Sequence, residues 1–174
     1  MAGEEVLRQS LVTATDGRPL ARRVFFDDNS FELEASFLPL LKAHASYLRE
    51  HPECVAVVSG HTQGQARQRH CWLLGERRSR AVVQALLAAG AQACQIAWIS
   101  KGEYKPDVPQ DPRSAKYRRR VNIEHVGPED LGNKLVLPPG APRGWKATLW
   151  SERASPKQAR PWRMDGQSGK TKTP

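Results

Sequence analysis

The sequence predicts an α/β domain in which helices pack on a β-sheet. Two β-branched runs, 54–59 and 95–100, are typical of buried strands. Apolar residues at helical spacing precede the first run and lie between the two. After a proline-containing loop, 101–117, residues 119–126 alternate in polarity and predict a last strand. Strands and helices that alternate in this way are typical of helices layered on a sheet.

The N-terminal segment, residues 1–23, predicts an extension that contains a hairpin. Asp16–Gly17 is a typical turn pair, and a short strand at 11–13 would precede it. The returning strand is expected at 18–26. Its last three residues, Val24–Phe25–Phe26, are β-branched and aromatic, so we expect them to form a buried strand.

The first helix is predicted between Ser36, a suitable N-cap, and His51–Pro52, which ends it. Pro39 is tolerated because it falls in the first turn. We expect His44 to be a packed or hydrogen-bonded core residue, because it lies on the apolar stripe of the helix. That stripe consists of Phe37, Leu40, Leu41, His44, Tyr47 and Leu48.

The second helix is expected to begin near Gly75 and to end at Gly90. The loop before it and its first turns contain five arginines and one carboxylate, that of Glu76. A helix start that follows a strand offers free backbone N–H groups to a ligand. Arginine pairs with carboxylates and phosphates through its planar fork, so we expect a ligand that carries one of these groups. The five arginines are Arg67, Arg69, Arg77, Arg78 and Arg80.

Residues 127–174 differ in composition from the rest of the chain. They contain seven of the 13 prolines and nine cations against four anions, a net charge of +5. We expect no helix or strand here, because neither period is present. The segment nevertheless contains Trp145, Trp150 and Trp162, and tryptophan is common at interfaces. The sequence therefore predicts a basic, proline-rich extension held by protein subunits or by the domain surface, with a solvated tail as the alternative.

The overall charge limits the class of partner. The chain of 174 residues has a net charge of +9 and a pI near 9.9, which favours nucleic acid, an anionic polymer or membrane face, or an acidic protein. No apolar run approaches the ~18 residues of a membrane span. The N-terminus lacks a basic region followed by an apolar one, so it does not predict a secretory signal.

The residues that could carry chemistry do not predict an enzyme. The sequence shows no Ser–His–Asp, Cys–His or paired-carboxylate arrangement. Cys54, Cys71 and Cys94 form no CxxC pair and are expected to be unpaired thiols. His61, His70 and Cys71 are too few for a metal site. We therefore expect a non-enzymatic protein with no metal or cofactor.

A series of short motifs extends over some three-fifths of the chain, residues 24 to about 125. It begins at Val24–Phe25–Phe26, continues through Gly60–His61, is clearest at Leu74–Gly75–Glu76–Arg77–Arg78 and closes at Arg119–Arg120–Val121. In these motifs the chain resembles the OmpA-like peptidoglycan-binding domain, and most closely its peptidoglycan-associated lipoprotein branch. The resemblance implies a domain at 24–126, built as a two-layer sandwich. Its order would be β-α-β-α-β-loop-β, with two main helices on a mixed sheet.

The resemblance also implies a non-catalytic site for the diaminopimelate side chain of the cell-wall peptide. In the family, an Asp at the end of the second strand binds the ammonium of this ligand, and an Arg binds its carboxylate. Arg78 matches the Arg, but Gln63 stands where the family has the Asp, and Cys71 stands where it has a loop Asn. Thr62 and Asn29 complete the candidate site.

The effect of Gln63 on ligand affinity can be estimated from hydrogen-bond energies. A hydrogen bond to a charged group contributes roughly 1.5–3 kcal/mol and a neutral one roughly 1. A loss of about 1.5 kcal/mol costs roughly tenfold in affinity. We therefore expect weak binding of wall material, or binding of a carboxylate by Arg78 alone. The alternative role for Arg78 is a structural salt bridge with Glu76 or Asp27.

A basic patch is expected beside the site. It would bind phosphate or a partner, and the alternative is the solvated rim of an edge strand. The patch consists of Arg67, Arg69, Arg118, Arg119 and Arg120.

The leading hypothesis is a non-catalytic OmpA-like module of the cell envelope, located in the periplasm if the chain is exported. It would be peptidoglycan-associated, or a derivative that serves as an anchoring or structural module. The alternative is a cytoplasmic or particle-associated structural subunit of a large assembly, such as a secretion apparatus, phage particle or ribonucleoprotein. Its basic surface would then bind protein or, less in keeping with the motifs, nucleic acid.

Overall fold

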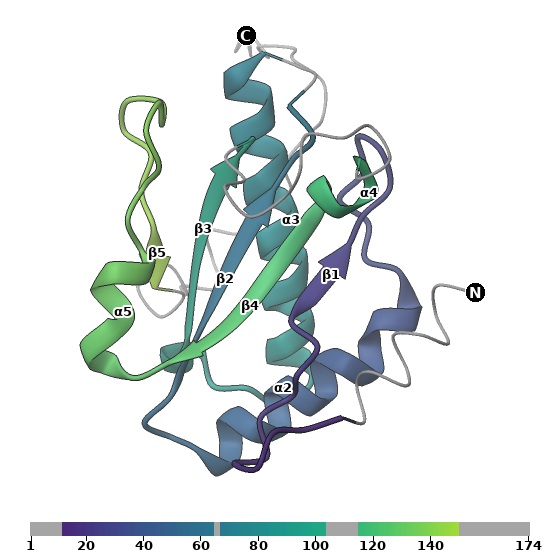
Figure 1. Cartoon of the computed structure of the whole chain (residues 1–174), viewed down its shortest axis with the longest axis vertical. Helices are drawn as coiled ribbons and strands as arrows, with labels where there is room; N and C mark the ends of the chain where they lie inside the picture. The colour runs from purple at the N-terminus through teal and green to yellow at the C-terminus, as the bar shows by residue number, and fades with distance from the viewer. Residues whose placement is uncertain (1–11, 65–66, 104–114, 150–174) are drawn as a thin grey trace, which may run out of the picture.

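The computed structural model describes residues 12–64, 67–103 and 115–149 (Figure 1). In chain order its elements are β1 (Arg23–Phe25), the 3-10 turn η1 (Ala35–Phe37), α2 (Leu38–Glu50), β2 (Val55–His61), α3 (Gln68–Ala88), the 3-10 turn η2 (Ala93–Gln95), β3 (Ile96–Gly102), α4 (Ala115–Arg118), β4 (Arg120–Val126), α5 (Pro128–Lys134) and β5 (Thr148–Leu149).

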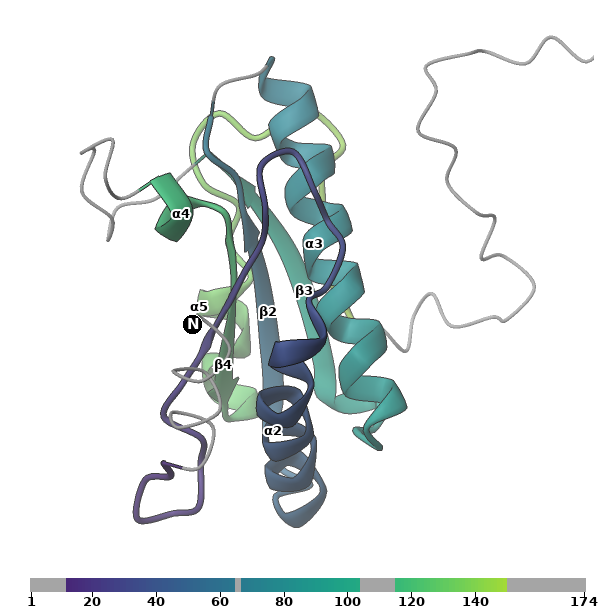
Figure 2. The same ribbon diagram turned by 90° about the vertical axis from the view of Figure 1, so that its right-hand side faces the viewer.

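The described strands form one mixed sheet in the order β1-β4-β2-β3-β5. β2 and β3 are parallel and are joined through α3, whereas the other neighbouring strands run antiparallel. Figure 2 shows α2 and α3 on the same side of this sheet. The predicted two-layer sandwich, with two main helices on a mixed sheet, is therefore confirmed.

The core lies between the sheet and the two long helices. Alternate residues of the central strands face the helices, as the two-residue period of a strand requires, and are fully or almost fully buried. Apolar side chains from one face of each helix meet them. The central members are Leu40, Leu41, Leu48, Ala56, Val58, Val82, Val83, Leu86, Ile96, Trp98, Val121 and Ile123.

Two glycines let α3 approach β2 closely. A Cβ atom added to Gly60 would overlap the carbonyl oxygen of Gly75 and lie 2.5 Å from the Oγ of Ser79. A Cβ atom added to Gly75 would overlap the Oγ of Ser100 on β3. The helix therefore rests on the sheet backbone at this point, and the next turn, with Arg78, is held beside the end of β2.

The start of α3 differs from the prediction. The helix begins at Gln68, seven residues before the expected start near Gly75. Its first turn is polar and exposed, so it showed no apolar period. Arg and Gln are nevertheless good helix formers, and the following Cys71 and Trp72 turn inward and are buried. Arg78 consequently lies in the middle of the helix, where the backbone offers no free N–H groups, and the predicted helix start near Gly75 is wrong.

The N-terminal end of the first helix also differs. Ser36 is not its N-cap, because a 3-10 turn over Ala35–Phe37 precedes α2 and the Ser36 hydroxyl instead hydrogen-bonds the carboxylate of Glu34 at 2.6 Å. Pro39 lies in the first turn and His51 ends the helix, as predicted.

Parts of the predicted N-terminal hairpin and of the long loop lie outside the described residues. Within residues 12–26, one bridge between Thr13 and Pro19 spans the turn at Gly17, whose φ is 81°, and the returning strand is limited to β1. Residues 104–114 of the loop are not described, and its last residues form the short helix α4.

The expectation that residues 127–174 contain no helix or strand is wrong for their first part. Residues 128–134 form α5, and β5 pairs antiparallel with β3. Such short elements depend on single anchoring contacts and not on a period. Lys134 pairs with Glu124 at 2.7 Å, and Lys101 donates to the carbonyl oxygen of Val136 at 2.8 Å. Residues 150–174, with Trp150 and Trp162, lie outside the described residues.

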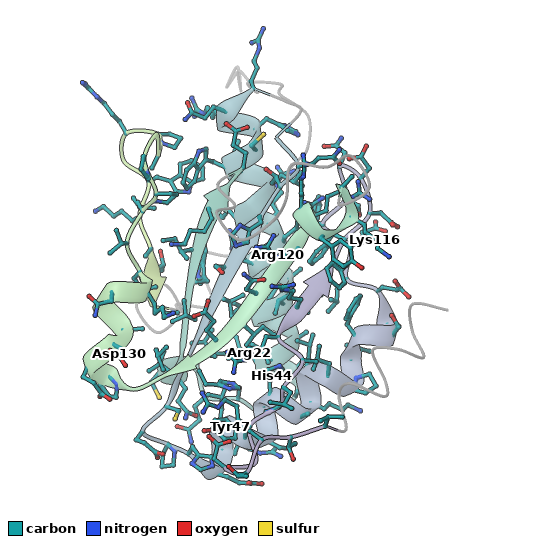
Figure 3. All side chains as sticks on the ribbon, viewed as in Figure 1. Arg22, His44, Tyr47, Lys116, Arg120 and Asp130 are labelled. Atoms are coloured by element: carbon teal, nitrogen blue, oxygen red, sulfur yellow. The ribbon has the colours of Figure 1, made fainter. Side chains whose placement is uncertain are left out.

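A histidine pair joins α2 to β4. His44 is fully buried, and its Nε2 hydrogen-bonds the carbonyl oxygen of Ala21 at 2.8 Å (Figure 3). Its Nδ1 lies 3.3 Å from the Nε2 of His125, whose ring also stacks on Tyr47. His44 is thus the hydrogen-bonded core residue predicted. Burial lowers its pKa to about 4, and burial together with His44 and nearby arginines lowers the pKa of His125 to about 3.

Replacement of Gly60 by alanine is expected to lower the free energy of unfolding by about 3 kcal/mol or more, because the new methyl group meets rigid backbone. Urea denaturation followed by circular dichroism measures this change. Gly132→Ala is the matched control, since a Cβ atom there meets nothing within 4 Å inside α5. It should leave stability unchanged or raise it by about 0.5–1 kcal/mol. Equal midpoints for wild type and Gly60→Ala would show that α3 does not need this close approach.

Stability is expected to fall with acidification because of the two histidines. Their folded-state pKa values lie below the ordinary 6.5, so the unfolded chain binds more protons below that pH. The stabilisation is complete above pH 6.5 and is lost as the pH falls toward about 4 and about 3. Arg22 and Arg18, which lower the pKa of His125, oppose protonation, and Asp16 favours it.

Urea denaturation between pH 7 and pH 4.5 should therefore show a loss of about 2 kcal/mol or more. His125→Phe keeps an aromatic ring beside Tyr47 and should make this dependence clearly shallower. An equally steep pH dependence in His125→Phe would show that other groups cause the acid sensitivity.

Candidate functional site

A hollow of about 270 Å³ lies where β2 ends. Its walls come from the loop after β1, the residues at the end of β2, the first half of α3 and the residue before β4. All five residues of the predicted site line it, although they are up to 49 positions apart in the chain. They are Asn29, Thr62, Gln63, Cys71 and Arg78. Asp28, His70 and Arg119 also line it.

Arg78 is fully buried and is hydrogen-bonded to three backbone carbonyls. Its Nε donates to Ser30 at 2.7 Å, its Nη1 to His61 at 3.0 Å and its Nη2 to Asp27 at 3.0 Å. A guanidinium has five N–H donors, so one on Nη1 and one on Nη2 remain. Burial, and next the charge of Arg119, lower the pKa of Arg78 to about 10, which leaves it a cation at neutral pH.

The predicted salt bridges of Arg78 are not the contacts observed. Asp27 contributes its carbonyl oxygen and not its carboxylate, and the Glu76 carboxylate lies 4.0 Å from Arg80. The guanidinium is therefore a structural tie between α3, β2 and the loop after β1. Because it also borders the hollow, the structural and the ligand-binding roles expected for Arg78 are compatible.

Gln63 is already engaged by a cation. Its Oε1 accepts a hydrogen bond from the Nη1 of Arg119 at 2.8 Å, and the Nε of Arg119 donates to the carbonyl oxygen of Phe26 at 3.2 Å. The sequence placed Arg119 in a surface patch and not in the site. Strand pairing explains its position, because Gly60 lies opposite Val121 and the same register continued outward brings Arg119 beside the end of β2. That register is not legible in the sequence.

Thr62 has an unusual hydroxyl group. The residue is 2% exposed, its backbone N–H donates to Gly102 at 2.8 Å, and within the described part of the chain its Oγ1 has no hydrogen-bond partner. A buried polar atom without a partner costs free energy, so such groups are uncommon unless they serve a function. Thr62 is one of the residues that line the hollow, and its hydroxyl is buried beside it.

Asn29 and Cys71 come from different elements, the loop after β1 and the helix α3. Asn29 has a φ of 51°, a left-handed conformation that asparagine tolerates better than most residues. This turn brings its Oδ1 to 3.1 Å from the Nε2 of His70 at the start of α3. Cys71, one residue further along the helix, is buried.

The five residues of the predicted basic patch do not form one surface. Arg67 and Arg69 are exposed at the start of α3, but Arg119 lines the hollow and Arg118 is half-buried. Arg120 is fully buried, and it donates to the Oδ1 of Asn122 and the carbonyl oxygen of Tyr117, both at 2.9 Å. Successive side chains of a strand point to opposite faces of the sheet, so Arg120 and Val121 lie on different faces. The run of adjacent arginines in the sequence does not indicate this difference.

The described residues hold no group of three His, Cys, Asp or Glu side chains placed to bind a metal ion. None of the described helices combines the length and the apolar character that a membrane span requires.

Comparison with known proteins assigns the domain. A model of the OmpA family matches residues 25–120. The peptidoglycan-associated lipoprotein of Pasteurella multocida is 36% identical over 100 residues, which cover 56% of this chain and 67% of the relative. That of Legionella pneumophila is 34% identical over 99 residues, which cover 56% of this chain and 55% of the relative. The chain thus spans about half to two-thirds of these curated relatives.

Solved structures give the same result. The peptidoglycan-associated lipoprotein of Burkholderia pseudomallei has a TM-score of 0.60 and 30% identity, covering 64% of this chain and 97% of that one. The C-terminal domain of Helicobacter pylori MotB has a TM-score of 0.55 at 19% identity, covering 66% of this chain and 92% of that one. The second likeness shows the fold alone. Domains of this family are non-catalytic, in agreement with the sequence prediction. The chain therefore belongs to the OmpA family.

Proposed function

We propose that this chain is a non-catalytic module that binds a carboxylate-bearing peptide of peptidoglycan in the hollow at the end of β2. The observation that carries the proposal is the convergence of all five predicted site residues on one hollow bordered by a buried guanidinium. The named relatives are peptidoglycan-associated lipoproteins, and the family match, residues 25–120, includes these five residues.

The hollow offers two groups for a carboxylate. Arg78 keeps two N–H donors beyond its three carbonyl bonds, and Thr62 has an unpartnered hydroxyl. Hydrogen bonds between a cation and a carboxylate are among the stronger ones in proteins. Arg78 is held rigidly by its carbonyl bonds, so little conformational entropy is lost when it binds a ligand.

The hollow is less suited to an ammonium group. Gln63 contributes no charge, and the carboxylate available for an ammonium is that of Asp28, which is exposed. We expect free diaminopimelate to bind about tenfold more weakly than it would with an aspartate at residue 63. The role supported best is therefore that of a weak or altered peptidoglycan-binding module.

The proposed location is the cell envelope. The named relatives are peptidoglycan-associated lipoproteins, and peptidoglycan is part of the cell envelope. Protein subunits bound through residues 127–174 remain part of the proposal, and the described part of this segment, up to residue 149, contacts the chain's own sheet and α3.

A second candidate is the structural subunit with a basic binding surface. The net charge of +9 and the exposed Arg67 and Arg69 favour it. Such binding depends on released counterions and weakens steeply with salt, whereas a hydrogen-bonded carboxylate in a hollow is screened less. The two candidates therefore differ in their salt dependence.

Retention on purified peptidoglycan across a salt series tests the proposed function. Wild type should stay bound at about 150 mM salt, where exposed charges beyond roughly 8 Å are screened. Thr62→Val removes the unpartnered hydroxyl with little change of shape and should reduce retention several-fold. Arg67→Gln is the control on the exposed rim and should change retention little. Binding that falls with salt alone, and equally for both variants and for RNA, would favour the basic surface.

Arg78→Lys is expected to lower the free energy of unfolding by about 2–4 kcal/mol, because lysine cannot serve three diverging carbonyls and leaves some unpaired. Arg80→Lys, two positions along the same helix, is the control. Its half-buried i,i+4 pair with Glu76 is long, at 4.0 Å, and should contribute about 0.5 kcal/mol. Thermal and urea denaturation measure both variants. Equal stability of the two would mean that the carbonyl bonds of Arg78 contribute little to folding.

A further inference from the structure

We propose that the hollow selects a carboxylate whose neighbouring nitrogen is a neutral amide N–H, and that it discriminates against a free ammonium. The ligand class is an N-acylated amino acid with a free carboxylate. This inference rests on the proposed function and specifies the chemical group that the same hollow recognises. Three observations carry it: the donors left on Arg78, the Thr62 hydroxyl, and the bond between Gln63 and Arg119.

The carboxylate half of the site is defined by Arg78 and Thr62. The carbonyls of Asp27, Ser30 and His61 fix the guanidinium plane, so the donors left on its two Nη atoms have fixed directions. Thr62 lines the same hollow, and its buried hydroxyl has no partner among the described residues. A carboxylate accepts several hydrogen bonds at once and satisfies both groups.

The nitrogen half is defined by the amide oxygen of Gln63. This oxygen has two lone pairs, and the Nη1 of Arg119 occupies one of them at 2.8 Å. Arg119 cannot easily withdraw, because its Nε is bound to Phe26. A nitrogen that used the second lone pair would lie about 5 Å from the Arg119 guanidinium, by ordinary hydrogen-bond geometry. An ammonium there meets a like charge, whereas an amide N–H does not.

The charge balance of the hollow leads to the same conclusion. Two guanidiniums, those of Arg78 and Arg119, face one carboxylate, that of the exposed Asp28. An N-acylated amino acid carries one negative charge and complements the excess cation. A free amino acid is a zwitterion with no net charge and leaves that excess in place.

Two parts of a wall peptide have this chemistry. One is the C-terminal residue, whose nitrogen is in a peptide bond. The other is a diaminopimelate whose second amine is acylated in a cross-link. The probes are meso-diaminopimelate, its mono-N-acetyl derivative and N-acetyl-D-alanine. Isothermal titration calorimetry with the full chain compares their affinities.

We expect mono-N-acetyl-diaminopimelate or N-acetyl-D-alanine to bind at least about tenfold more tightly than diaminopimelate, since one like-charge contact is removed. The tighter of the two acetylated probes identifies the part of the peptide recognised. Gln63→Asp places a carboxylate beside Arg119 and should reverse the order, so that diaminopimelate binds more tightly than either. Gln84→Asp adds the same charge at an exposed site on α3, remote from the residues that line the hollow, and should preserve the wild-type order.

Diaminopimelate binding to wild type as tightly as the acetylated probes would overturn the selectivity and leave the proposed function standing. The same order of affinities in Gln63→Asp and Gln84→Asp would also overturn the selectivity, because the charge at residue 63 would then have no effect. Retention on peptidoglycan without measurable binding of any probe would again overturn the selectivity alone. If neither the probes nor peptidoglycan bind, both the selectivity and the proposed function fail.

Discussion

The buried guanidinium of Arg78 is the interaction on which the site depends. Its three carbonyl acceptors belong to the loop after β1 and to the end of β2, while its backbone belongs to α3. Burying a cation is costly unless it is hydrogen-bonded, and these bonds meet that requirement. The carbonyls are dipoles and do not cancel its charge. The remaining charge borders the hollow, where the exposed Asp28 compensates it in part.

The position of that guanidinium follows from the packing of α3. Gly60 and Gly75 bring the middle of the helix onto the sheet backbone, and one turn later Arg78 reaches the last carbonyl of β2. A larger residue at either glycine would lift the helix away from His61. The close approach of the backbone at Gly60 and Gly75 thus determines where the Arg78 side chain lies. The sequence motif identifies Arg78 but does not give its position.

Much of the fold was predictable because strands and helices leave periodic signals. Such a signal predicted the two central strands and the helix that contains His44. The glycine after α3 predicted the end of that helix, and motif similarity identified Arg78, Gln63 and Thr62. The errors arose where no period exists. The exposed first turn of α3 has no apolar face, and neither α5 nor β5 is long enough to show a period.

Long-range pairing was the other source of error. The sequence runs Arg118, Arg119, Arg120 as three equivalent cations, yet one is half-buried, one binds Gln63 and one is fully buried. Strand register and alternation decide which is which, and both depend on contacts with distant residues. The same register places Arg119 beside Gln63. The sequence showed Gln63 only as a neutral residue in place of an aspartate, whereas in the structure its amide oxygen already accepts a hydrogen bond from Arg119.

Residues 127–149 add to the domain a layer that the family match does not include, since that match ends at residue 120. Figure 2 shows α5 on the side of the sheet away from α2 and α3. The chain then reaches the first turns of α3, and only after that does β5 pair with the edge of β3. At these turns of α3, Trp145 packs against Trp72 with ring centroids 6.0 Å apart, and Gln68 donates to the carbonyl oxygen of Gly140. Those turns carry His70 and Cys71, which line the hollow. The segment outside the family match therefore contacts the turns of α3 that line the hollow, while the carbonyl bonds of Arg78 hold the same helix further along.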